Sequence, residues 1–123
     1  MKLILHIKSL LKLKSKEEFA DFETWLKNRH GFSEFLYVTS EGLPILGNFK
    51  ENIDEIAAEV PELVKALSVL ETSKSYAIKT GDESIYVIIR ISGDVLMLAK
   101  GSKIPRKSDV QEIIQKTRLE FKI

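Results

Sequence analysis

The stretch YVTSEGLPILGNF, residues 37–49, decides the fold class. Two short apolar runs flank residues 40–42, and Gly42 can adopt the positive φ of a tight turn without steric cost. The pattern predicts a strand, a turn and a second strand. Pro44 follows the turn directly, and a proline cannot donate a ladder hydrogen bond, so within a sheet it is confined to the start or the edge. We therefore expect the hairpin to end at a sheet margin.

Helices are predicted on both sides of this hairpin, which we place at 34–40 and 43–47. Ser15 and Glu18 form a capping box that opens a first helix, and Gly31 ends it. A second helix begins at Asn52 with Glu55 as its capping partner, and Pro61 predicts a kink or a break within it. The apolar faces consist of Phe19, Phe22, Trp25 and Leu26 in the first helix, and of Ile53, Ile56, Ala57, Val60, Leu63, Val64 and Leu67 in the second.

Three strands are predicted next, at 73–79, 84–91 and 94–100, joined by short turns and therefore antiparallel. The last two are apolar on both faces, as is typical of central strands covered by helices on each side. The first carries Lys74 and Lys79 and has the character of an edge strand. Ser108 and Gln111 are expected to cap a final helix. The order α-β-β-α-β-β-β-α predicts an α+β fold, a five-stranded antiparallel sheet with helices on both faces. The inner face of the final helix is expected to hold Val110, Ile113, Ile114 and Thr117.

Residues 2–14 fit two patterns equally well. A helix would place Leu3, Ile4, Ile7, Leu10 and Leu11 on one face, whereas a strand would turn the odd-numbered residues inward. The leucine and lysine content favours the helix. We describe residues 1–14 as an N-terminal amphipathic segment and residues 15–123 as the domain.

Composition narrows the class of protein. A length of 123 residues predicts one domain, and the absence of cysteine excludes disulfides, thiolate metal sites and cysteine nucleophiles. The net charge of +1 gives no overall attraction to nucleic acid, although residues 1–16 hold five lysines and no acid, residues 41–71 are acidic and residues 101–107 are basic. Neither a membrane-spanning run nor a signal peptide is recognisable, so we expect a cytoplasmic protein without stable membrane insertion.

Motifs that carry catalytic chemistry are missing from the sequence. It has neither a glycine-rich phosphate loop nor a G-x-S-x-G elbow. His6 is expected to be solvated and His30 to lie at a helix end, while the acidic residues of the second helix have the spacing of a solvent face. We therefore predict no catalytic, cofactor-binding or metal-binding residues, and no enzyme.

The stretch FLYVTSEGLPIL, residues 35–46, preceded by a helix, resembles the opening hairpin of roadblock/dynein light chain (LC7-like) domains. Residues 53–58, IDEIAA, resemble the start of that family's central helix, and a three-stranded meander with a closing helix completes the order. The resemblance covers residues 15–121. Profilin-like and longin-like domains share a related architecture.

The resemblance implies a dimeric, non-catalytic adaptor or regulator of a small Ras-like GTPase, without cofactor or nucleic-acid partner. Its dimer partner would be a second copy or a related roadblock protein. The alternative is a stand-alone, profilin-like sensor that binds a small ligand, which a pocket lined by residues 103–107 would favour. By the resemblance, the dimer interface comprises Ala57, Ala58, Pro61, Tyr76, Ala77 and Ile78, and the partner-facing residues are Asp54, Glu55, Glu59 and Glu62.

Overall fold

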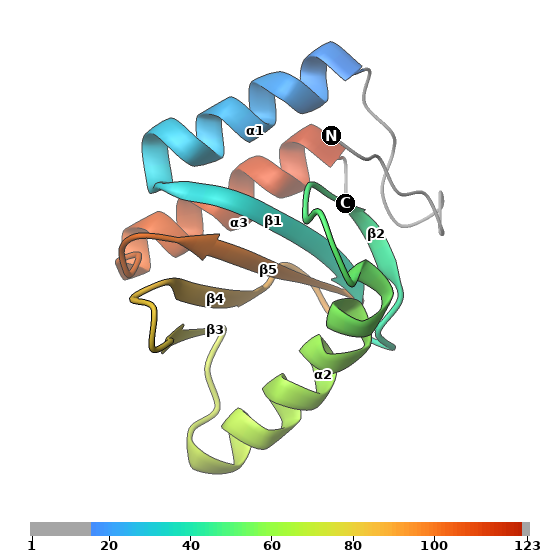
Figure 1. Cartoon of the computed structure of the whole chain (residues 1–123), viewed down its shortest axis with the longest axis vertical. Helices are drawn as coiled ribbons and strands as arrows, with labels where there is room; N and C mark the ends of the chain where they lie inside the picture. The colour runs from blue at the N-terminus through green and yellow to red at the C-terminus, as the bar shows by residue number, and fades with distance from the viewer. Residues whose placement is uncertain (1–15, 122–123) are drawn as a thin grey trace.

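A computed structural model describes residues 16–121 and confirms the predicted order of helices and strands (Figure 1). Ser15, His6 and the two alternatives for residues 2–14 lie outside the described residues. The elements are α1 (Lys16–His30), β1 (Phe32–Thr39), β2 (Pro44–Gly47), α2 (Ile53–Leu70), β3 (Ser75–Lys79), β4 (Ile85–Arg90), β5 (Val95–Gly101) and α3 (Lys107–Phe121).

The five strands form one antiparallel sheet in the order β2-β1-β5-β4-β3. The hairpin β1–β2 and the meander β3–β4–β5 join through β1 and β5, with Leu36 opposite Leu98. Pro44 is the first residue of β2, which is one edge of the sheet, so its missing N–H group lies at the margin as predicted. The opposite edge is β3, also as predicted.

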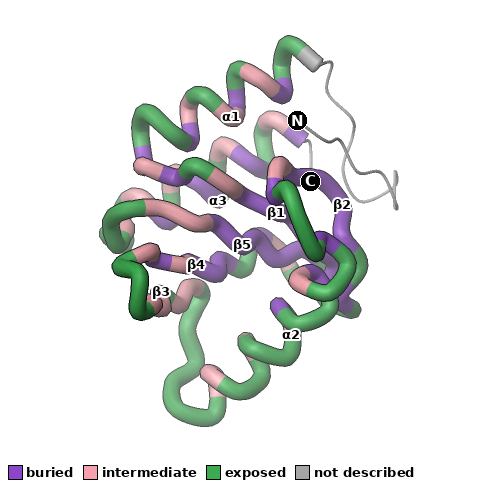
Figure 2. The backbone as a smooth tube through the Cα atoms, viewed as in Figure 1, coloured by how far each residue is buried: buried purple, intermediate pink, exposed green. Residues whose placement is uncertain are grey.

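Helices α1 and α3 cover one face of the sheet with a core rich in aromatic side chains (Figures 1 and 2). Phe22 packs edge-on against Phe121, with 5.5 Å between the ring centroids, and against Phe35 at 6.0 Å. The Tyr37 hydroxyl lies 2.7 Å from the Thr117 Oγ1 atom, and burial raises the pKa of Tyr37. Buried side chains from both helices and from the strands fill this layer.

Helix α2 covers the other face only in part. Its buried residues, Ile53, Ala57 and Val60, all lie in its N-terminal half. They pack on a second core that includes Leu36 and Leu96. The C-terminal half of α2 extends beyond the strands, and there Val69 and Leu70 are each 84% exposed (Figure 1). One half of α2 is therefore a covering helix, and the other half presents apolar side chains to solvent.

Three predictions about helix ends and breaks are wrong. Asn52 precedes α2 in the left-handed conformation, with φ of 55°, and makes no side-chain capping hydrogen bond. Ser108 lies inside α3, which is instead capped by the Asp109 carboxylate accepting the Arg106 N–H group at 2.9 Å. Pro61 lies inside α2, which runs without interruption from Ile53 to Leu70, so the predicted break is wrong, whereas the kink stays a prediction.

Candidate interaction surface

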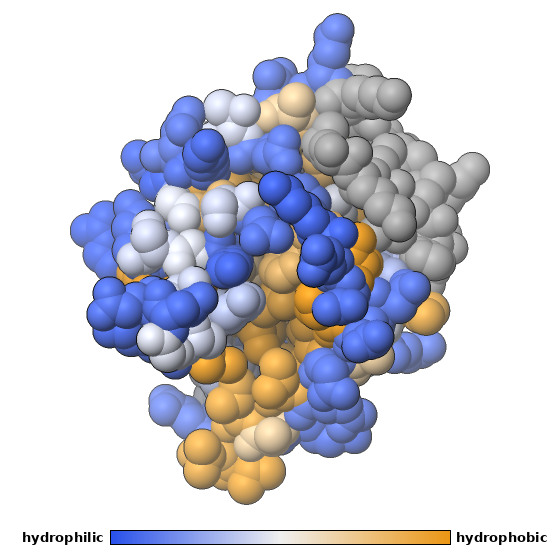
Figure 3. Space-filling view, viewed as in Figure 1, coloured by the Kyte–Doolittle hydropathy of each residue, from blue (hydrophilic) through white to orange (hydrophobic). Residues whose placement is uncertain are grey.

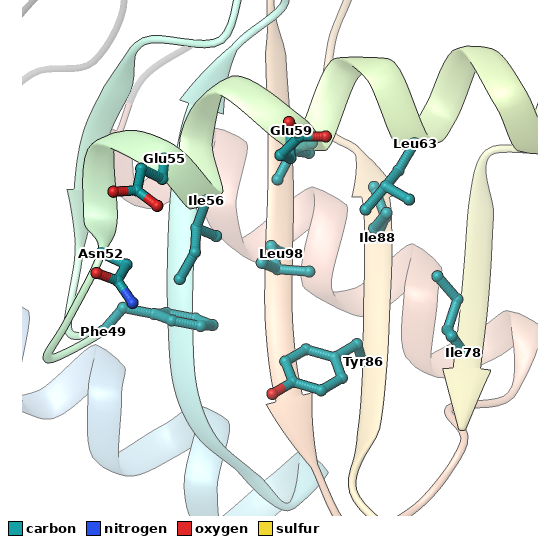
Figure 4. A pocket seen from close by; sticks show the side chains of 11 residues that line it. Phe49, Asn52, Glu55, Ile56, Glu59, Leu63, Ile78, Tyr86, Ile88 and Leu98 are labelled. Carbon is teal, nitrogen blue, oxygen red and sulfur yellow. The ribbon is translucent and has the colours of Figure 1, made fainter. Parts of the chain in front are cut away.

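An apolar groove of about 500 Å³ lies between α2 and the strands β3, β4 and β5 (Figure 4). Its helix side carries Ile56 and Leu63, which is 40% exposed although the sequence places it on the core face. Phe49 closes the end nearest the start of α2. Strands β3, β4 and β5 supply the floor, formed by Ile78, Tyr86, Ile88 and Leu98.

Negative charge borders the groove on its helix side. The exposed carboxylates of Glu55 and Glu59 stand on α2 above the apolar floor (Figure 4). On the strand side, the Lys100 ammonium lies 5.7 Å from the centroid of the Tyr86 ring. The groove therefore suits an apolar surface whose positive charges run along the α2 side.

Apolar residues also gather outside the groove, over α2 and the neighbouring strands (Figure 3). Residues 63–70 of α2 contain no acid, unlike residues 54–62. Leu63, Val69 and Leu70 are exposed there. Large exposed apolar patches on soluble proteins often mark interaction sites.

The outer edge of β3 is open along the strand. Two hydrogen bonds bracket the β3–β4 pair: Arg90 N–H donates to the Lys74 carbonyl at 2.8 Å, and Thr80 N–H to the Ser84 carbonyl at 2.9 Å. Because paired and unpaired positions alternate in an antiparallel ladder, the N–H and C=O groups of Tyr76 and Ile78 point toward β4. The backbone groups at the intervening positions point outward and are available for another strand. Those positions are Ser75, Ala77 and Lys79.

The predicted interface residues on β3 differ in their surroundings. Ala77 is exposed, whereas Tyr76 and Ile78 are half-buried on the face that α2 covers. The Tyr76 hydroxyl donates to the Glu71 carbonyl at 2.7 Å and accepts the Ser73 N–H group at 3.0 Å. Tyr76 therefore also holds the connection between α2 and β3 within the subunit.

The predicted interface residues on α2 also have a role inside the subunit. Ala57 is fully buried, and Ala58 is exposed beside the β1–β2 turn. Gly42 in that turn has φ of +92°, and a Cβ atom there would lie 3.0 Å from the Ala58 Cα atom. Small residues on both sides let the turn approach the helix. The role of these alanines in a dimer stays a prediction.

The remaining predicted residues lie on the two sides of α2. All four predicted partner-facing carboxylates are exposed, and Glu55 and Glu59 line the apolar groove. Pro61 is half-buried and lines, together with Glu62 and Arg90, a second groove of about 560 Å³ on the opposite side of α2. The structure therefore separates Glu62 from Glu55 and Glu59.

The basic stretch 103–107 does not line the apolar groove. From this stretch, Lys107 borders a cleft of about 460 Å³ between the start of β3 and α3, which Lys74 also borders. Within residues 16–121, no group of three histidine or acidic side chains has the geometry of a metal site, and no helix has the length and apolar character needed to cross a membrane.

His30 lies at the end of α1, as predicted, but it is buried, which the sequence did not indicate. Its ring centroid is 4.9 Å from that of Trp25, and its Nε2 atom is 3.0 Å from a Glu112 carboxylate oxygen. Arg29 donates to the same carboxylate at 3.0 Å, and this hydrogen bond is the main reason why the pKa of Glu112 is lowered. His30 is 2% exposed and therefore joins α1 to α3 within the core.

The strand order and the placement of the helices define a roadblock/LC7-type fold. The solved structures with this fold include the gliding protein MglB from Thermus thermophilus, at 11% identity and a TM-score of 0.63, covering 89% of this chain and 91% of that one. Myxococcus xanthus MglB is 13% identical with a TM-score of 0.63, covering 88% and 94%. The Roadblock/LC7 domain from Streptomyces avermitilis is 10% identical with a TM-score of 0.61, covering 78% and 91%. At these identities the likeness concerns the fold.

Sequence comparison adds one relative. An uncharacterized protein of Archaeoglobus fulgidus is 27% identical over 100 residues, which are 81% of this chain and 58% of that protein. The chain thus spans little more than half the length of this relative. No protein-family profile matches the sequence.

Proposed function

We propose that this protein is a cytoplasmic, dimeric and non-catalytic adaptor or regulator of a small Ras-like GTPase. The observation that carries the proposal is the open edge of β3 beside an exposed apolar half-helix, within a roadblock/LC7-type fold. The GTPase partner follows from the resemblance of residues 35–58 to roadblock domains, which bind or regulate such GTPases.

Pairing of two β3 edges around a two-fold axis would continue the sheet across both subunits. Each copy offers its outward N–H and C=O groups at Ser75, Ala77 and Lys79. The exposed side chains of Val69 and Leu70 would be covered by the same contact, since α2 leads into β3. A solved MglB of related fold, with a TM-score of 0.55, is described as having a tetrameric arrangement.

The acidic side of α2 is the proposed contact for the GTPase. Asp54 and Glu62 are exposed and lie outside the apolar groove. Charges of this kind at the rim of an interface mainly affect the association rate and partner choice, so a basic patch on the partner would complement them.

Affinity capture from a native lysate tests this proposal, with the purified chain as bait and with either GDP or a non-hydrolysable GTP analogue present. We expect a P-loop GTPase to be retained, with an amount that depends on the nucleotide. Asp54→Lys/Glu62→Lys should lose it, whereas Lys27→Glu, an exposed change on α1, should retain it. Absence of any GTPase in both nucleotide states, or equal retention by the double variant, would overturn the proposal.

A further inference from the structure

We infer that residues 2–14 of this chain pair with the outer edge of β2 as an additional strand of the sheet. The inference does not rest on the proposed GTPase partner or on the proposed dimer. It concerns the edge of the sheet opposite β3, so it leaves the β3 edge and the apolar groove available.

The β2 strand is buried although it is an edge of the described sheet. All four of its residues are buried, with Ile45 and Leu46 at 2% and 3% exposure, whereas no residue of the β3 edge is buried. The Asn48 N–H group donates to the Phe35 carbonyl at 3.0 Å, so by alternation the N–H and C=O groups of Gly47 point away from β1. Buried backbone groups need hydrogen-bond partners, and an extended segment beside β2 supplies them.

The chemistry of this edge selects an extended segment over a helix. A helix uses its own N–H and C=O groups internally, so residues 63–70 of α2 from a second copy cannot continue the ladder. Residues 2–14 can continue it, because as a strand they have an apolar and a polar face. Apart from Ser9, the odd-numbered face holds Leu3, Leu5, Ile7, Leu11 and Leu13, and apart from Ile4 and Leu10, the even-numbered face holds Lys2, His6, Lys8, Lys12 and Lys14.

The two faces of β2 match this alternation. The β1–β2 register shifts at the middle of the pair, and Ile45 and Leu46 both belong to the core beneath α1, which the odd-numbered side chains would extend. On the other face α2 contacts β2, and the exposed carboxylates of Glu51 and Asp54 lie at the start of this helix. The lysines of the even-numbered face would therefore meet negative charge.

The connection to α1 is short and needs no passage around the sheet. Phe19, in the first turn of α1, packs in the same core as Ile45 and Leu46, and Figure 1 shows the start of α1 on the same side of the molecule as β2. If residues 3–9 pair with β2, residues 10–15 remain as the connection and span up to about 20 Å when extended. Pro44 has no N–H group and offers only its carbonyl, so the pairing centres on Gly47.

Amide hydrogen exchange of the full-length chain, followed by NMR, tests the pairing. We expect the Gly47 amide to be protected like that of Leu46, which points toward β1 and is the internal control. Leu5→Asp places a charge on the face toward the core and should speed exchange at Gly47 by about tenfold or more, with Leu46 unchanged. Ile4→Asp is the matched control, because position 4 is on the polar face of a strand but on the apolar face of a helix, and it should leave the Gly47 rate unchanged.

Nuclear Overhauser effects (NOEs) identify the paired segment and the chain that supplies it. In the unchanged, uniformly labelled chain, Gly47 should show NOEs to backbone protons of residues 2–14. Absence of these NOEs, an unprotected Gly47 amide, or faster Gly47 exchange in Ile4→Asp than in Leu5→Asp would overturn the inference. In a mixture of isotope-labelled and unlabelled chains, NOEs between unlike chains should be missing at Gly47, and their presence would assign the edge to a second copy and overturn pairing within one chain.

Discussion

Prolines at neighbouring positions of β3 separate the contacts within one subunit from those between subunits. The N–H group of Ala77 points outward, so Ala77→Pro removes no hydrogen bond from the β3–β4 ladder. In a two-fold pairing centred on this residue, Ala77 meets Ala77 of the partner subunit and each donates to the other. The change then removes two hydrogen bonds per dimer, about 1–3 kcal/mol in total, and weakens dimerisation by about 5- to 150-fold.

The proline at the next position has the opposite expectation. The N–H group of Ile78 points toward Tyr86 on β4, and the Ile78 side chain packs against the core on the α2 face. Ile78→Pro leaves the Tyr86 carbonyl without its donor and disturbs this packing, so we expect it to lower the free energy of unfolding by about 2–4 kcal/mol. Ala77→Val keeps the N–H group and suits a strand, so it serves as the matched control.

Sedimentation velocity over a concentration series and thermal unfolding followed by circular dichroism measure the two effects. We expect Ala77→Pro to be a folded monomer at concentrations where the unchanged chain and Ala77→Val are dimers, and Ile78→Pro to unfold at a lower temperature. A dimer of unchanged affinity for Ala77→Pro would refute pairing through β3. An unfolded Ala77→Pro would instead refute the assignment of its N–H group to the outer edge.

Three further changes test the rest of the structure. Leu96→Ala, at 1% exposure in the second core, should lower the free energy of unfolding in urea by about 2–5 kcal/mol, and an unchanged midpoint would contradict the position of β5 at the centre of the sheet. Tyr37→Phe and Thr117→Val should each lower the free energy of unfolding by about 1 kcal/mol, because each removes one of two paired hydroxyl groups. The double variant should lose less than the sum of the two, and strictly additive values would exclude the hydrogen bond between these hydroxyls. The hydrogen bond from the Thr80 hydroxyl is the main reason why the pKa of Asp82 is lowered to about 2 from its usual 3.8. Asp82→Ala should therefore have a lower thermal midpoint than the unchanged chain above about pH 4, and this difference should vanish as the pH falls through 2. A difference that stays constant with pH would contradict the depressed pKa.

The sequence predicted the sheet and its edges because local constraints determine them. Pro44 excludes a central position for its strand, and two-sided apolar strands require helices on both faces. The helix caps were harder to predict, because any nearby polar side chain can fulfil that role: Asp109 caps α3 through the Arg106 N–H group, although Ser108 had the better motif. The burial of His30 depends on Trp25 and Glu112, and Glu112 is far away along the chain, so no local pattern could show it.

The groove was missed for a related reason. Helical spacing placed Leu63 on the same face as Val60, and that assignment of faces is correct, but it does not state how much of the helix the sheet covers. Coverage depends on where the helix crosses the strands, which is a tertiary property. The signal in the sequence is that residues 63–70 contain no acid, whereas residues 54–62 contain four acidic residues.

The two faces of the sheet differ in how completely helices cover them. On the face of α1 and α3, aromatic side chains such as Phe22 and Phe121 fill the interior. On the face of α2, a single helix covers a five-stranded sheet, and one helix about 10 Å wide cannot cover strands spaced about 4.8 Å apart across the whole width. Ile78 of β3 and Tyr86 of β4 stay half-buried on this face, next to the open edge. The β3 edge and the apolar groove beside it are therefore the two places where the single subunit leaves this side of the sheet open.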